Sequence, residues 1–149
     1  MVRRIPEGYP NVTAYLVNEG VDRVIRFLRQ AFGATERFPP MMRPEGTIMH
    51  AEMRIGDSVV MMGEACVECP PMPACFYIYV EDVDGTYRRA LRAGAVAVSE
   101  PRDQFYGDRS AGVRDPSGNL WWIATHKEDV SDQEMERRFR ASLAYSGAV

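Results

Sequence analysis

Residues 12–34, VTAYLVNEGVDRVIRFLRQAFGA, can be laid over residues 74–95, ACFYIYVEDVDGTYRRALRAGA. Each stretch has the pattern of an apolar strand, an acidic turn, a Val-Asp pair, an amphipathic helix and a Gly-Ala stop. Apolar residues recur at helical spacing in both helical parts. Gly33 and Gly94 stand where the end of a helix favours a left-handed residue. The chain therefore contains two copies of one folding unit.

The segments that follow the two helices correspond as well. Residues 47–64, TIMHAEMRIGDSVVMMGE, and residues 107–126, GDRSAGVRDPSGNLWWIATH, both show a strand, a turn and a strand, which predicts a hairpin in each unit. A further strand is expected at 95–99, with a weaker counterpart near 35–38. Each unit, called a module below, is therefore predicted to be β-α-β-β-β.

We expect an α+β fold in which two βαβββ modules form a curved mixed sheet around a concave cavity, with a C-terminal helix added. A sheet unit with a helix on one face leaves its other face uncovered, and that face is expected to line the cavity. Ser131 and Glu134 have capping-box spacing and predict the start of the last helix. The predicted boundaries within a single domain over residues 1–149 are module one at about 11–64, a linker at 65–73, module two at about 74–126 and the helix at about 131–145.

Composition and charge exclude several classes of protein. The 149 residues carry 18 basic and 21 acidic side chains, well mixed, with a net charge of -3. Nucleic acids and anionic membranes are bound by a basic stripe, and there is none. No apolar run reaches the roughly 18 residues of a membrane span, and the N-terminal residues lack the pattern of a secretory signal. We therefore expect a cytoplasmic protein with no nucleic acid or membrane partner.

The three cysteines, Cys66, Cys69 and Cys75, agree with a reducing compartment, because an odd number cannot pair completely within one chain. Cys66 and Cys69 have the spacing of half a zinc site or of a redox pair. A zinc ribbon needs a second pair, and a redox pair favours a helix that begins at its first cysteine, whereas Pro70 follows at once. The favoured interpretation is loop thiols, and a redox role is left open.

Trp121 and Trp122 are adjacent on the last predicted strand, so their side chains point to opposite faces of the sheet. Only one of them can pack beneath the helices. The other faces the predicted cavity.

The sequence resembles the glyoxalase / bleomycin-resistance / extradiol-dioxygenase superfamily, also called vicinal oxygen chelate proteins. The resemblance covers about Asn11 to about Val130, and it is closest to a glyoxalase-like branch with HAE in the third strand and ATH near the end. Members of this superfamily form dimers whose cavities lie between modules and often across subunits, so the resemblance implies a homodimer, with or without exchanged modules. The stretches that carry it are VDRVIRFLRQAFGA, IMHAEMRIGDSVVMM, YVEDVDGTYRRALRAGA and VRDPSGNLWWIATH.

In metal-dependent members four cavity residues, each His, Glu or Gln, hold a divalent ion. Carried over by position, these ligands fall on Thr13, Met61, Cys75 and Trp122. None is a ligand of that kind, so the resemblance implies no metal site and no cofactor, and it argues against metal-dependent lyase or dioxygenase activity. It also places Trp122 in the cavity and Trp121 beneath the helices.

Strand alternation supplies the remaining lining of the cavity. In the third strand Met49, Ala51, Met53 and Ile55 are predicted to form the core stripe. A pocket of aromatic, methionine and a few polar side chains is typical of a small-molecule site, and Met41 and Met42 are expected to help close it. The predicted ligand-binding residues are Thr13, Tyr15, His50, Glu52, Met61, Cys75, Tyr77, Trp122 and, from an overhanging loop, Phe105 and Tyr106.

His50 and Glu52 share a face of one strand and are the candidate catalytic pair. They could bind a metal together, with His126 as a third ligand, or Glu52 could orient His50 as a general base. The alternative is a structural polar cluster in which Glu52 pairs with Arg54 or Arg114, and His126 then lies at the surface or at a dimer edge.

Three functions follow. The first is non-catalytic binding or sequestration of a hydrophobic, aromatic small molecule in the cavity, as in drug-resistance proteins. The second is a glyoxalase- or dioxygenase-like enzyme that uses His50 and Glu52 with a non-standard metal site or with none. The third is a stress-linked or regulatory dimer whose cavity is filled by its own side chains.

Overall fold

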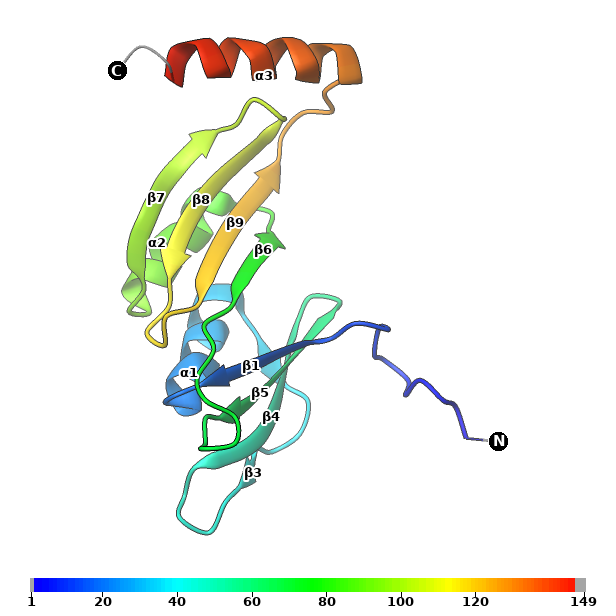
Figure 1. The fold of residues 1–149 in the computed structure, drawn as a ribbon, viewed down its shortest axis with the longest axis vertical. Coiled ribbons are helices and arrows are strands. Elements are labelled where there is room, and N and C mark those ends of the chain that lie inside the picture. The colour runs from blue at the N-terminus through cyan, green and yellow to red at the C-terminus, as the bar shows by residue number, and fades with distance from the viewer. Residues whose placement is uncertain (1, 147–149) are drawn as a thin grey trace.

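The computed structural model describes residues 2–146, and its elements follow the predicted order (Figure 1). The α+β class, the βαβββ modules and the C-terminal helix are confirmed. The elements are β1 Ala14–Asn18, α1 Val21–Phe32, β2 Thr35–Glu36, β3 Met41–Met42, β4 Ile48–Ile55, β5 Ser58–Glu64, β6 Cys75–Tyr79, α2 Val83–Arg92, β7 Val96–Asp103, β8 Asp108–Arg114, β9 Leu120–His126 and α3 Asp132–Ser146.

The two modules have the same strand topology. In module one the strand order is β1-β5-β4-β2, and the short β3 also pairs with β4. In module two the order is β6-β9-β8-β7. In both, the first strand runs parallel to the last, and the other neighbours are antiparallel. The repeat seen in the sequence is therefore a repeat of topology.

The ends of the two module helices are fixed in different ways. The carboxylate of Glu64, at the end of β5, accepts hydrogen bonds from the backbone N–H of Gly20 (2.6 Å) and Val21 (3.0 Å) at the start of α1. Helix α2 has its own cap, because Asp82 accepts from the N–H of Gly85. Gly33 and Gly94 have φ of 66° and 99°, which confirms the predicted left-handed helix stops.

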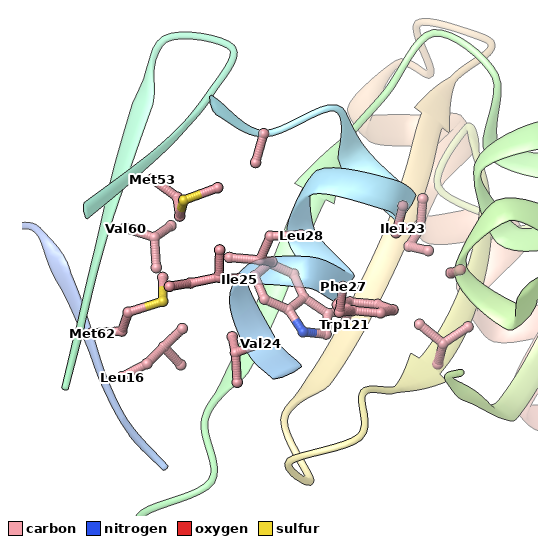
Figure 2. Close-up of a cluster of buried hydrophobic side chains, with 14 of the residues drawn as sticks. Leu16, Val24, Ile25, Phe27, Leu28, Met53, Val60, Met62, Trp121 and Ile123 are labelled. Carbon is pink, nitrogen blue, oxygen red and sulfur yellow. The ribbon is translucent and has the colours of Figure 1, made fainter. Parts of the chain in front are cut away.

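Helix α1 packs between the two sheets. On one side it contacts Leu16, Met53, Val60 and Met62 of module one, and on the other side it meets Trp121 and Ile123 of β9 (Figure 2). The indole of Trp121 is buried, with ring centroids 4.4 Å from Phe76, 5.0 Å from Phe32 and 6.5 Å from Phe27. The prediction that Trp121 packs beneath the helices is confirmed.

This shared core keeps the two sheets separate, where the sequence suggested one curved sheet. The apolar faces of both sheets converge on α1 and α2, so the opposite face of each sheet, called its open face below, points away from the common core. Among residues 2–146, no hydrogen bond or ring contact joins the predicted cavity residues of module one to those of module two. A single chain therefore presents two separate open faces.

One predicted core residue is wrong. The side chain of Met49 is 48% exposed, whereas Ile48 is buried. Ile48 and Ala51 both face the core although they are three positions apart, so the strict alternation of β4 is broken between them.

Helix α3 lies at the end of the second sheet, far from module one (Figure 1). It is attached through a ring contact between Phe139 and Phe105, and through Arg138, which pairs with Glu128. In the described part of the chain no helix is long and apolar enough to cross a membrane.

Candidate ligand-binding site

The open face of module one carries a polar chain that begins at Tyr15. The Tyr15 hydroxyl lies 3.3 Å from Nδ1 of His50, and Nε2 of His50 lies 3.1 Å from Oε1 of Glu52. Glu52 is only 4% exposed. Both ring nitrogens of His50 therefore have a neighbouring side chain within hydrogen-bond distance.

The other oxygen of Glu52 is held by two further residues. Oε2 accepts hydrogen bonds from the Tyr9 hydroxyl (2.5 Å) and from Nη1 of Arg37 (3.3 Å). The Arg37 guanidinium also lies 4.2 Å from the centre of the Tyr9 ring. Glu52 is therefore the centre of a polar cluster. Its cationic partner is Arg37, so the predicted pairing with Arg54 or Arg114 is wrong.

The ionised state of Glu52 follows from these contacts. Burial alone would raise the pKa of this carboxyl, but the hydrogen bonds from Tyr9 and His50 and the charge of Arg37 lower the pKa below its ordinary value. In return, the hydrogen bond to Glu52 raises the pKa of the Tyr9 phenol. The cluster holds one buried carboxylate as an anion and neutralises it locally.

The N-terminal segment lies against this face. Together with Thr13 and Met61, two of the predicted site residues, it lines an open hollow of about 630 Å³. The segment contributes Arg4, Ile5, Pro6, Tyr9, Pro10 and Asn11 to the wall.

The open face of module two is built around Trp122, which lies directly over Gly112. The two residues are register partners on β9 and β8. A Cβ atom added at Gly112 would come within 2.7 Å of Cζ3 of Trp122, so only glycine leaves room for the indole to lie against the strand. Trp122 is half-buried and faces away from the helices, opposite Trp121.

Two tyrosines extend the aromatic surface beside Trp122. The hydroxyls of Tyr77 and Tyr79 donate to Oδ2 of Asp108 at 3.0 and 2.9 Å. Because β9 lies between β6 and β8, both side chains reach across the sheet, and Ala124 on β9 is completely buried. Their ring centroids are 5.3 Å apart, and their side chains remain 46% and 63% exposed. Trp122, Tyr77 and Tyr79 are together called the aromatic platform below.

Asp108 is 4% exposed and anchors this platform. Its second oxygen, Oδ1, lies 2.8 Å from Nδ1 of His126, and Nε2 of His126 lies 2.9 Å from Asp129. Burial would raise the pKa of the Asp108 carboxyl, but the hydrogen bonds from His126, Tyr79 and Tyr77 lower the pKa below its ordinary value. Hydrogen bonding to Asp108 and then to Asp129 raises the pKa of His126.

The tyrosines of the platform remain protonated. Burial, and then the hydrogen bonds to Tyr106 and Asp108, raise the pKa of Tyr77. The hydrogen bond to Asp108 raises the pKa of Tyr79. Neither phenol is suited to act as a base at neutral pH.

The structure separates the predicted site residues into two groups. Thr13, Tyr15, His50, Glu52 and Met61 belong to module one, and Cys75, Tyr77, Trp122, Phe105 and Tyr106 belong to module two. Cys75 is exposed at the start of β6.

The two loops expected to close the cavity lie beside different modules. Tyr106 reaches the platform, with its hydroxyl 3.4 Å from that of Tyr77, whereas Phe105 packs against α3. Met41 and Met42 form the short strand β3, which pairs with β4 of module one, and both side chains are exposed.

Sequence reasoning missed the residues that set the geometry, namely Tyr9, Arg37, Asp108 and Gly112. Gly112 had a usable signal, because a glycine opposite a tryptophan in a predicted hairpin indicates close approach of the ring. Asp108 begins the strand whose residues 110 and 112 also face the platform. Tyr9 and Arg37 lie outside the main strands, and alternation says nothing about them.

The residues present do not suit a divalent ion. Of the four positions that correspond to family ligands, Met61 offers a thioether and Trp122 an indole, and neither side chain supplies an anionic donor. Thr13 and Met61 belong to module one, whereas Cys75 and Trp122 belong to module two, which has a separate sheet. The third metal ligand predicted beside His50 and Glu52 is also wrong, since His126 lies in module two. Within residues 2–146 no group of three or more His, Cys, Asp or Glu side chains could hold a metal.

Comparison with known proteins agrees with this architecture. Protein Mb0911c of Mycobacterium bovis is 32% identical over 143 residues, which cover 85% of this chain and 90% of that protein. The crystal structure of TioX from Micromonospora sp. ML1 is 27% identical with a TM-score of 0.65, and the match covers 78% of this chain and 98% of TioX. The fosfomycin resistance protein FosX from Mesorhizobium loti shares the fold, at 17% identity and a TM-score of 0.58, over 87% of this chain and 98% of FosX.

The family model of the Glyoxalase/Bleomycin resistance protein/Dioxygenase superfamily matches residues 11–123, which include both modules up to the middle of β9. The chain therefore belongs to the glyoxalase/bleomycin resistance protein/dioxygenase superfamily.

Proposed function

We propose that this protein binds and sequesters a planar aromatic small molecule on the open face of module two, without chemistry of its own. The observation that carries the proposal is the aromatic platform: Trp122 lies on Gly112, and the hydroxyls of Tyr77 and Tyr79 are fixed on the buried Asp108. Aromatic side chains held in place lose little conformational entropy on binding, and their faces stack well on planar ligands. In the single chain the platform is half-exposed.

Two of the names found in the comparisons refer to drug resistance. FosX is named as a fosfomycin resistance protein, and the family description includes bleomycin resistance. Removal of a drug by binding needs no metal or cofactor, which fits the residues at the four ligand positions. An odd number of cysteines supports a cytoplasmic location for such a protein.

We also propose that the protein is a homodimer in which module one of one copy covers the platform of the other. The support is that both open faces expose large side chains, among them Tyr15 and Met49 on module one and Tyr77 and Tyr79 on module two. Light scattering after gel filtration should give twice the chain mass of 16.8 kDa. A monomer at micromolar concentration would contradict the dimer and leave the platform itself to be tested separately.

The test of binding compares two tryptophan variants. Planar bicyclic and tricyclic aromatics, cationic, neutral and anionic, are titrated by calorimetry into the wild type, Trp122→Ala and Trp121→Phe. Trp122→Ala should weaken binding about tenfold or more, because a stacked ring is lost, while the melting temperature is nearly unchanged. Trp121→Phe should lower the melting temperature and keep the affinity, because Trp121 belongs to the core.

Unchanged affinity in Trp122→Ala would show that the platform is not the site. A wild type that binds none of the compounds, and whose melting temperature none of them shifts, would instead favour the regulatory dimer filled by its own side chains.

A further inference from the structure

The two buried carboxylates of the open faces are neutralised differently. Glu52 in module one forms an ion pair with Arg37 at 3.3 Å. Asp108 in module two is as deeply buried, yet in the described chain, residues 2–146, no arginine or lysine forms an ion pair with it. Its partners are two tyrosine hydroxyls and His126.

His126 does not cancel the negative charge at this end of the platform. Its two ring nitrogens are shared between Asp108 and Asp129. A protonated imidazole contributes one positive charge that is shared between the buried Asp108 and the fully exposed Asp129, so it neutralises Asp108 only in part.

The nearest arginine along the chain is directed elsewhere. Arg109 follows Asp108 on β8 and therefore points to the opposite face, where it pairs with Asp84 of α2 at 2.7 Å and with Asp103 at 3.1 Å. The sequence thus places a cation beside Asp108 in the chain while strand alternation keeps it away from the platform.

The two tyrosines extend the electrostatic effect of Asp108 to the exposed surface of the platform. A phenol that donates a hydrogen bond to a carboxylate gains electron density in its ring, and the face of an aromatic ring already attracts cations. The exposed faces of Tyr77 and Tyr79 therefore lie in a negative field that originates from the Asp108 carboxylate at their hydroxyls.

We infer that the aromatic molecule bound on the platform carries a positive charge, and that this charge lies over Tyr77 and Tyr79 while its planar ring stacks on Trp122. The inference rests on the proposed function and adds the chemical class of the ligand, a cationic planar aromatic. Asp108 is then the residue that determines specificity for charge, and it acts through the two tyrosines.

Two probes of nearly the same shape test the inference on the wild-type protein. N-methylquinolinium has a permanent positive charge, and 1-methylnaphthalene is its neutral counterpart. Calorimetry should show that the cation binds about tenfold more tightly, as expected for a partly desolvated cation–π contact. The indole N–H resonance of Trp122 should shift on binding, while that of Trp121, which donates to Asp115, should not.

Asp108→Asn tests the source of the selectivity, with Asp84→Asn as a matched control. Both variants remove one negative charge from module two, but Asp84 lies on the helix side and pairs with Arg109. Asp108→Asn should reduce the preference for the cation to about twofold or less, measured as the ratio of the two affinities within the variant, so that any loosening of the platform affects both probes alike. Asp84→Asn should keep the tenfold preference.

The outcomes separate the inference from the proposed function. Equal binding of both probes by the wild type, or tighter binding of the neutral probe, would overturn the inference and leave the aromatic platform intact as a binding site. A preference that survives Asp108→Asn would also overturn it. Absence of binding by either probe would contradict both. If Asp108→Asn does not fold, the comparison of the two probes on the wild type still decides the question.

Discussion

Asn18 and Asn119, which stand 101 positions apart, exchange two hydrogen bonds through their side-chain amides, at 2.9 and 3.2 Å. Asn18 ends β1 of module one, and Asn119 precedes β9 of module two, so the pair joins the two modules directly. Oδ1 of Asn119 also accepts from the N–H of Ala74, and its Nδ2 donates to Asp115. Both asparagines are completely buried, and this junction replaces hydrogen-bonded pairing between the two sheets.

Asn119→Ala should lower the free energy of unfolding by about 2 to 3 kcal/mol, because it leaves the amide of Asn18 and the carboxylate of Asp115 buried without these partners. Denaturant unfolding measures the loss. Asn11→Ala, at an exposed asparagine, is the control and should cost less than about 0.5 kcal/mol. A loss of similar size in both variants would show that the amide pair does not hold the modules together.

The fit of Trp122 over Gly112 predicts a strong coupling between the two positions. Gly112→Ala should cost about 1 to 3 kcal/mol in the wild type, since the new methyl group overlaps the indole and must displace it. In the Trp122→Ala background the same substitution should cost almost nothing, because the space is then empty. Unfolding of the four proteins of this cycle gives the coupling energy. Equal costs in the two backgrounds would mean that the indole does not lie on Gly112.

The hydrogen bond from Tyr9 to Glu52 predicts a pH-dependent loss of stability. Because the folded-state pKa of Glu52 is lowered, its contribution is present above the unfolded-state pKa and is lost as the pH falls through the folded-state pKa. Tyr9→Phe should cost about 1 to 2 kcal/mol at pH 7 through loss of a charge-assisted bond, and the difference from wild type should shrink at a pH below about 4.

Thermal unfolding of both proteins between pH 3 and pH 7 measures this difference. Tyr9→Phe in a Glu52→Gln background is the control, and it should show a smaller and pH-independent cost. A cost that is constant over the whole range in the Glu52 background would exclude the carboxylate as the partner.

Purification without chelator should yield protein with far less than one metal ion per chain, measured by mass spectrometry. The reason is that Met61 and Trp122 supply no anionic donor at the positions that correspond to family ligands. Near-stoichiometric zinc, nickel, manganese or iron would contradict this expectation. Such a result would favour the hypothesis that the protein is an enzyme that uses His50 and Glu52.

The sequence by itself determined the duplicated βαβββ topology, the helix stops at Gly33 and Gly94, and the placement of Trp121 and Trp122 on opposite faces of one strand, while the family resemblance indicated that Trp121 is the buried one. The first three features follow from local periodicity and turn chemistry, which depend only on residues that are close together in the sequence. Met49 shows the limit of that reasoning, because one break in the alternation of β4 moves a predicted core residue to the surface.

Only the tertiary structure decided which side chains meet. Alternation fixes the face on which a residue lies, but not its neighbours across the sheet or on distant loops. It could not show that Arg37, rather than Arg54 or Arg114, neutralises Glu52, or that Tyr77 and Tyr79 reach across β9 to Asp108. It also could not show that α1 packs between the two sheets and turns their open faces away from the common core, because that depends on how two apolar sheet faces share one helix.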